Sequence, residues 1–229
     1  MLRLVRESPV AARAFPFFCF VLLTSFQGSL GGLSQYWLYA LKTGLGAWLV
    51  WLVRDRVPEM RWSVSLPAIL AGVGVFALWV GLDGFYPSLT SIVGKGAAAA
   101  EPSPWNPFRD FGPGTPAAWA CIGVRWVGAA IVVPPIEEMF YRSFFYRSVE
   151  RADFLSMPLT AFAPRGFFIT ALVFGLVHPR EWIPGVLCGM VFQGLVLRRG
   201  HLGDAMTAHG ITNLLLGLWV VWKGAWQFW

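Results

Sequence analysis

Long runs of apolar residues alternate with short polar segments along most of the chain. The runs lie at about 12–30, 33–53, 64–84, 117–145, 166–178, 182–198 and 203–222. Most are close to the roughly 20 residues that an α-helix needs to cross a bilayer, and they are continuous rather than alternating, which argues against a transmembrane β-barrel. The pattern predicts an all-α, polytopic membrane bundle of about seven transmembrane helices, within a range of six to eight.

The segment 87–116 interrupts this pattern. It holds several prolines and the turn Gly112-Pro113-Gly114, which together disfavour a continuous helix. We therefore expect a single membrane-embedded domain over residues 1–229, in which residues 87–116 form an extramembrane loop.

Composition agrees with a membrane protein. Apolar residues make up 56% of the chain and charged residues only 13%, against about 25% charged in an ordinary soluble domain. The formal net charge is +6, but most Lys and Arg residues lie between the apolar runs, so they indicate topology rather than a nucleic-acid partner. Their bias towards one side predicts a cytoplasmic N-terminus.

Ionisable side chains inside apolar runs are costly in lipid, so they are the first candidates for function. Glu138 and Arg142 are four residues apart and share one helical face, whereas Glu137 is turned about 100° away and is left free. Pro134 and Pro135 lie just upstream and predict a helix break or start. The carboxylates would then lie in a first turn, whose free amides favour an anion.

Further polar groups occur in the last runs of the chain, at His178, His209 and Asn213. At 1.5 Å per residue from the expected cytoplasmic ends, Glu137 and these three residues lie about 9 to 18 Å deep. Polar groups from three helices therefore reach similar depths, as a water-holding site inside a membrane requires.

Each group also has a purely structural interpretation. A Glu-Arg pair one turn apart can clamp a helix, and a His and an Asn can bridge neighbouring helices. Arg125 is either a counter-ion for a carboxylate on another helix or a contact for the C-terminal carboxylate of a substrate. A pair between Lys42 and Asp83 is also conceivable. The convergence of the four groups at one depth favours function.

The ordered motifs Glu-Glu-x-x-x-Arg, Phe-x-x-x-His and His-x-x-x-Asn, which run from Glu137 to Asn213, resemble the CPBP family of intramembrane proteases. This family includes the type II CAAX prenyl endopeptidases and the Abi bacteriocin-immunity proteins. The resemblance covers about 117–222 and implies a catalytic core there. Residues 153–158 and the final Gln-Phe-Trp are similar to the CAAX prenyl protease-related subgroup of bacteria with exosortase systems, which implies a bacterial inner membrane.

The resemblance implies a glutamate-dependent endopeptidase. Glu137 would act as general base on a water that His178 holds and polarises, and His209 and Asn213 would donate hydrogen bonds to the oxyanion. Glu138 and Arg142 would support them. No cofactor is implied in this version.

A zinc ion held by Glu137, His178 and His209 is the alternative, since two histidines and one carboxylate form a known hydrolytic arrangement. The chain has no His-Glu-x-x-His zinc helix and no Gly-x-Ser-x-Gly nucleophile elbow. The metal-free version is preferred because Asn213 suits oxyanion donation better than ligation.

The implied substrate is a membrane-anchored or prenylated protein or peptide, cleaved in the bilayer near its C-terminus at a CAAX-like or sorting signal. A non-catalytic protein that binds a peptide or confers bacteriocin immunity would use the same polar cavity. An ion-coupled transporter is disfavoured, because the chain has no repeated halves.

Overall fold

The computed structural model describes residue 5, residues 7–94 and residues 105–229. This part of the chain is helical and contains no strand, so the all-α prediction is confirmed for it. The longer helices are α2 (Pro9–Ser25), α3 (Ser34–Val53), α4 (Leu66–Gly81), α7 (Pro116–Val127), α10 (Pro164–Leu176), α11 (Trp182–Arg199) and α12 (Gly203–Lys223). The shorter ones are α5 (Leu89–Val93), α6 (Pro107–Phe111), α8 (Val133–Glu138) and α9 (Tyr146–Glu150).

Each predicted apolar run corresponds to a helix whose ends differ from the prediction by a few residues. Two helices in the described residues are long and apolar enough to cross a membrane, namely Pro116–Glu150 and Gly203–Lys223, while α2, α4 and α10 are apolar but shorter. The count of about seven spans therefore stays a prediction. Within 87–116 only the short helices α5 and α6 are present, and residues 95–104 of that segment lie outside the described residues.

Pro116–Glu150 forms one uninterrupted helix, which we call the central helix. The expected break at Pro134 and Pro135 is therefore wrong. Two π-helical segments, Gly128–Val132 and Met139–Phe145, flank the prolines, and the wider π turn absorbs residues that cannot donate a backbone hydrogen bond. The carboxylates that follow the prolines consequently lie inside a helix rather than in its first turn.

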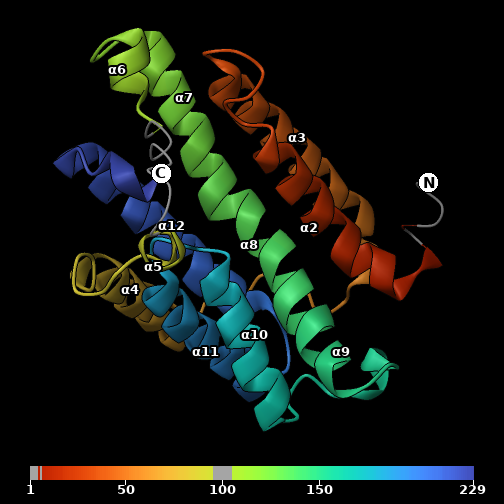
Figure 1. The fold of residues 1–229 in the computed structure, drawn as a ribbon. Helices are drawn as coiled ribbons and strands as arrows, with labels where there is room; N and C mark the ends of the chain where they lie inside the picture. The colour runs from red at the N-terminus through yellow and green to blue at the C-terminus, as the bar shows by residue number, and fades with distance from the viewer. Residues whose placement is uncertain (1–4, 6, 95–104) are drawn as a thin grey trace.

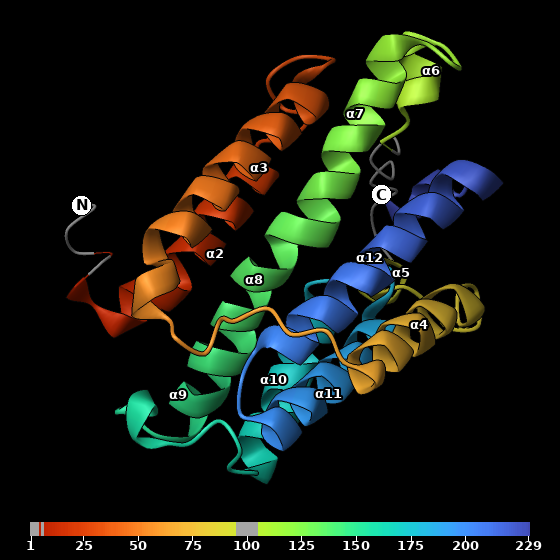
Figure 2. The same cartoon turned by 180° about the vertical axis from the view of Figure 1, so that it is seen from behind.

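The central helix separates two groups of helices (Figures 1 and 2). The α2–α3 hairpin lies on one side of it, and α4, α10, α11 and α12 lie on the other. Helices α10 and α11 approach closely: a Cβ on Gly185 would lie 2.9 Å from the Cα of Gly175, and one on Gly189 would lie 2.9 Å from the Cα of Ala171. Small residues thus allow these two backbones to touch, as is typical of packing between membrane helices.

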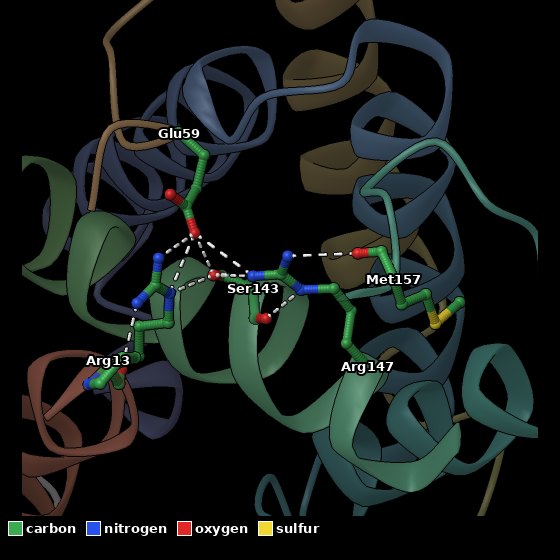
Figure 3. A network of polar contacts seen from close by, with 6 residues as sticks. Arg13, Glu59, Ser143, Arg147 and Met157 are labelled. Atoms are coloured by element: carbon green, nitrogen blue, oxygen red, sulfur yellow. Dashed lines mark hydrogen bonds and ion pairs between the residues drawn. The ribbon is translucent and has the colours of Figure 1, made fainter. Parts of the chain in front are cut away.

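A buried polar cluster, here called the Glu59 network, ties α2 and the α3–α4 connection to the end of the central helix (Figure 3). Glu59 Oε1 accepts from Arg13 Nη2 at 2.7 Å and from Arg147 Nη2 at 3.3 Å. The hydroxyl of Ser143 donates to the same oxygen and accepts from Arg13 Nε at 2.7 Å. Arg147 Nη1 also donates to the carbonyl of Met157 at 3.3 Å. The network holds the loop before α4 against the helix that carries the candidate site.

Candidate active site

The two adjacent glutamates have different surroundings. Glu138 is completely buried; its Oε2 accepts from Arg142 Nε at 3.1 Å, and its Oε1 lies 3.0 Å from His209 Nδ1. The Glu137 side chain is 19% exposed, and its Oε2 lies 4.0 Å from His209 Nε2, beyond hydrogen-bonding distance. The predicted Glu138–Arg142 pair is therefore present, and Glu137 keeps both carboxylate oxygens available.

The prolines that were expected to break the helix position Asn213 instead. Pro134 and Pro135 have no N–H, so the carbonyl of Ala129 in the preceding π turn lacks a helical partner. Asn213 Nδ2 donates to this carbonyl at 2.8 Å. The bond fixes which end of the amide is the nitrogen, and the second N–H of that nitrogen remains for another acceptor.

Close backbone contacts hold α12 on both sides of His209. A Cβ on Gly210 would lie 2.6 Å from the carbonyl oxygen of Ala130 in the central helix. A Cβ on Gly72 of α4 would lie 2.7 Å from the carbonyl oxygen of Ala208. Because these positions leave no room for a side chain, the histidine is held at a fixed depth between the two neighbouring helices.

The two histidines are oriented in the same way. His178 Nδ1 lies 2.8 Å from the carbonyl oxygen of Phe174, which can only accept, so Nδ1 carries the proton. His209 Nδ1 is held by the Glu138 carboxylate in the same manner. In a neutral ring each Nε2 is then an acceptor, and it becomes a donor only when the ring is protonated. Donation by His209 Nε2 to an oxyanion therefore requires the imidazolium.

One cavity of about 190 Å³ contains all four predicted catalytic side chains. Glu137, His178, His209 and Asn213 line it together with apolar residues such as Trp79, Val133, Phe174 and Leu216. The structure thus brings together, from the central helix, α12 and the end of α10, the groups that the sequence places at similar depths.

Glu181 is a cavity residue that the sequence analysis missed. Its side chain is 12% exposed, and Arg180 Nε lies 3.4 Å from its Oε1. Burial outweighs the Arg180 charge and raises the pKa of Glu181 to about 7, and the nearby Asp83 adds to the shift. The available signal was a carboxylate three residues after His178, in a polar connection that resembled an ordinary loop.

The structure also tests two charged residues outside the motifs. Arg125 lines the cavity, and in the described part of the chain it forms no ion pair with a carboxylate, so the counter-ion interpretation finds no partner there. Lys42 Nζ donates to Thr24 Oγ1 at 2.8 Å and to Gln27 Oε1 at 2.6 Å. Asp83 lies 3.9 Å from Arg180. The conceivable Lys42–Asp83 pair is therefore wrong.

The zinc alternative requires three donors around one point. Within residues 5, 7–94 and 105–229, no group of three or more His, Cys, Asp or Glu side chains is placed to hold a metal ion. Glu137, His178 and His209 line the same cavity without forming such a group.

Comparisons with known proteins bear on the segment that carries this site. A search of curated proteins and a search of solved structures found no match. Residues 119–215 match the family model described as type II CAAX prenyl endopeptidase Rce1-like, which confirms the family resemblance that the motifs indicate. The finer subgroup remains a prediction. The segment from residue 119 to 215, which holds the site from Arg125 to Asn213, is therefore similar to the Rce1-like type II CAAX prenyl endopeptidase family.

Proposed function

We propose that the protein is an intramembrane endopeptidase that hydrolyses a peptide bond near the C-terminus of a membrane-associated substrate. One observation carries the proposal: Glu137, a carboxylate with no hydrogen bond among the described residues, lines a small cavity that it shares with His178, His209 and Asn213. A free carboxylate beside oriented nitrogen groups is suited to water activation.

In the proposed reaction Glu137 takes a proton from a water, and the water oxygen attacks the carbonyl carbon of the scissile bond. The second N–H of Asn213 and the protonated Nε2 of His209 donate to the resulting oxyanion. When the tetrahedral intermediate collapses, the C–N bond breaks and the proton on Glu137 passes to the leaving amine. The products are a carboxylic acid and a free amine, and Glu137 returns to its ionised form.

The remaining motif residues act on these groups. His178 Nε2 accepts a hydrogen bond from the attacking water, because its Nδ1 already donates to the backbone. Glu138 accepts from both Arg142 and His209, so its charge stabilises the imidazolium that oxyanion donation needs. Glu138 and Arg142 are therefore positioning residues, and Glu137, His178, His209 and Asn213 touch the reacting groups.

The family resemblance of residues 119–215 and the apolar helices support an integral membrane protein. We extend this to a prenylated or otherwise membrane-anchored substrate, and to a bacterial inner membrane with the N-terminus in the cytoplasm. The orientation is supported by the basic residues of the Glu59 network and of the neighbouring turn Arg54–Arg56, which lie at one end of the bundle. The loop 87–116 and the tail after α12 would then lie on the outer side.

Cleavage of defined peptides tests the proposal. Purified protein in lipid nanodiscs is mixed with farnesylated CAAX peptides and with unprenylated membrane-anchored peptides, with and without a strong chelator. We expect wild-type cleavage that survives chelation and is lost in Glu137→Gln and His178→Ala. Asp55→Asn makes the same acid-to-amide change at an exposed residue outside the cavity and serves as the control.

The other outcomes are equally informative. Cleavage that is lost on chelation and restored by zinc would replace the general-base mechanism with a metal-dependent one. Peptides that bind without being cleaved by the wild type would contradict the enzyme proposal and favour a non-catalytic peptide-binding protein.

A further inference from the structure

Arg125 occupies a place in the cavity that the proposed chemistry does not use. It lies on α7, twelve residues before Glu137 on the central helix, and both side chains line the same cavity. Twelve residues of helix correspond to about 18 Å. The cavity therefore has a cationic residue well removed from the reacting groups.

Three aromatic rings hold this guanidinium. Its central carbon lies 4.9 Å from the ring centre of Tyr39, 4.7 Å from that of Trp105 and 5.2 Å from that of Trp229. Ring faces attract the positive charge but do not occupy the N–H donors as a carboxylate would. The aromatic cage thus stabilises a buried cation and keeps its five donors available.

The charges of the cavity wall point to an anionic ligand at this position. Arg125 is the only Lys or Arg among the described residues that line the cavity, whereas the carboxylates of Glu137 and Glu181 line other parts of it. No hydrogen bond or ion pair of the Arg125 side chain is present in the described part of the chain. An anion entering the cavity would be repelled by the Glu137 carboxylate and attracted by Arg125.

We propose that Arg125 binds the C-terminal carboxylate of the substrate and so selects chains that end shortly after the scissile bond. This inference rests on the proposed peptidase function and adds a specificity residue to it. A planar guanidinium matches a carboxylate with two parallel hydrogen bonds. Because Arg125 and Glu137 line one cavity, a chain whose C-terminal carboxylate binds Arg125 would place a peptide bond close to its C-terminus at Glu137.

The test compares each of two peptides in two forms, one with a free C-terminal carboxylate and one with a C-terminal amide. We measure kcat/KM of the wild type for both forms of a farnesylated CAAX peptide and of an unprenylated membrane-anchored peptide. A charge-assisted hydrogen bond predicts that the acid is preferred by about 10-fold to 100-fold. In Arg125→Gln the preference should fall to about 1, through loss of activity on the acid alone.

A structural role for the cage predicts a different result, because damage to the fold would lower both activities together and leave their ratio intact. Lys223→Gln is the matched control: Lys223 is also held over aromatic rings, those of Trp219 and Trp222, but it does not line the cavity, so its variant should keep the wild-type ratio. If Arg125→Gln does not fold, Arg125→Lys replaces it. Its point charge lacks the planar fork, so a reduced ratio is expected.

Binding measurements separate this inference from the proposed function. The affinity of the Glu137→Gln protein for fluorescent acid and amide peptides reports recognition without chemistry. Acid-selective binding with no cleavage by the wild type would overturn the peptidase function and leave the role of Arg125 intact. Equal binding and cleavage of both forms, or a wild-type ratio in Arg125→Gln, would overturn the role of Arg125.

Discussion

Two buried polar clusters each join the central helix to other segments, and they differ in how many of their polar atoms have a hydrogen-bond partner. In the Glu59 network, no buried side-chain nitrogen or oxygen of Arg13, Glu59, Ser143 or Arg147 lacks a partner. In the site cluster, formed by Glu137, Glu138, Arg142, His209 and Asn213, both terminal nitrogens of Arg142 are buried without a hydrogen bond. Glu137 and the Nε2 atom of His209 also form no hydrogen bond within the described residues.

The difference indicates which cluster is structural and which is available to a ligand. Burying a charge costs free energy unless it is paired and hydrogen-bonded, and the Glu59 network meets that condition within the protein. In the site cluster Glu138 and Arg142 pair with each other, whereas Glu137, His209 and Asn213 line a cavity. A comparison of unsatisfied atoms thus separates the two clusters, although both contain buried Arg and Glu side chains and both involve the central helix.

The largest effect should follow from Glu137→Gln. The change preserves the size of the side chain but removes the proton acceptor, so cleavage should fall by about 10² to 10⁴-fold. Because Glu137 forms no ion pair with Lys or Arg among the described residues, the melting temperature should stay within about 2 °C of the wild type. Peptide cleavage and thermal unfolding of the same preparation check both statements. A large loss of stability would place Glu137 with the structural residues.

Glu59→Gln should show the opposite behaviour. It leaves Arg13 and Arg147 buried without their shared carboxylate, which should lower the free energy of unfolding by about 3 to 5 kcal/mol. Cleavage per folded molecule should be unchanged, because the network does not line the cavity. Denaturation in detergent measures the loss. Asp55→Asn, at an exposed pair with Arg54, should cost less than about 1 kcal/mol. Equal losses in the two variants would contradict the comparison.

Glu59 in the network and Glu181 in the cavity should also make the stability of the fold depend on pH in opposite directions. Burial alone would raise the pKa of Glu59, but the Ser143 hydrogen bond and the Arg13 charge outweigh it and hold that pKa below its usual value. Glu59 therefore stabilises the fold above its ordinary pKa and loses this effect as the pH falls. The pKa of Glu181 is instead raised to about 7 by burial. The contribution of the protonated Glu181 carboxyl to the stability of the fold is therefore complete below about pH 4.5 and is lost as the pH rises through 7.

Stability curves of variants measure these opposite slopes. Between pH 4.5 and 8 the wild type should lose up to about 3 kcal/mol relative to Glu181→Gln, since each pKa unit corresponds to about 1.4 kcal/mol. Below pH 4.5 the wild type should lose its advantage over Glu59→Gln. Parallel curves for the wild type and Glu181→Gln would show that the Glu181 carboxyl is solvated.

The helices and the motif residues were predictable because their signals are local. The expected run 182–198 coincides with α11, Trp182–Arg199, because the apolar run ends at Arg198 and Arg199 and is followed by Gly200 in the left-handed conformation that terminates a helix. The Glu138–Arg142 pair follows from helical spacing alone. Both rules need only residues a few positions apart.

The remaining features depend on contacts across the fold. The Pro134–Pro135 pair resembles a helix break, and only the π turn, with the bond from Asn213 to Ala129, shows how the helix continues. The cage around Arg125 joins three segments that are distant in sequence. Glu181 entered the site because its loop folds against the cavity, which no periodicity reports.

The smallest predicted effect tests how tightly the site cluster is held. Gly210→Ala places a Cβ 2.6 Å from the carbonyl oxygen of Ala130, so α12 must move away from the central helix at a cost of about 1 to 3 kcal/mol. Gly194→Ala on α11 meets nothing within 4 Å and should be neutral or stabilise by up to about 1 kcal/mol. Movement of α12 would also lengthen the bond from Asn213 to Ala129, so kcat should fall in Gly210→Ala alone. If both alanine variants cleave at the wild-type rate, the site does not depend on this close approach, and Asn213 is positioned by α12 itself.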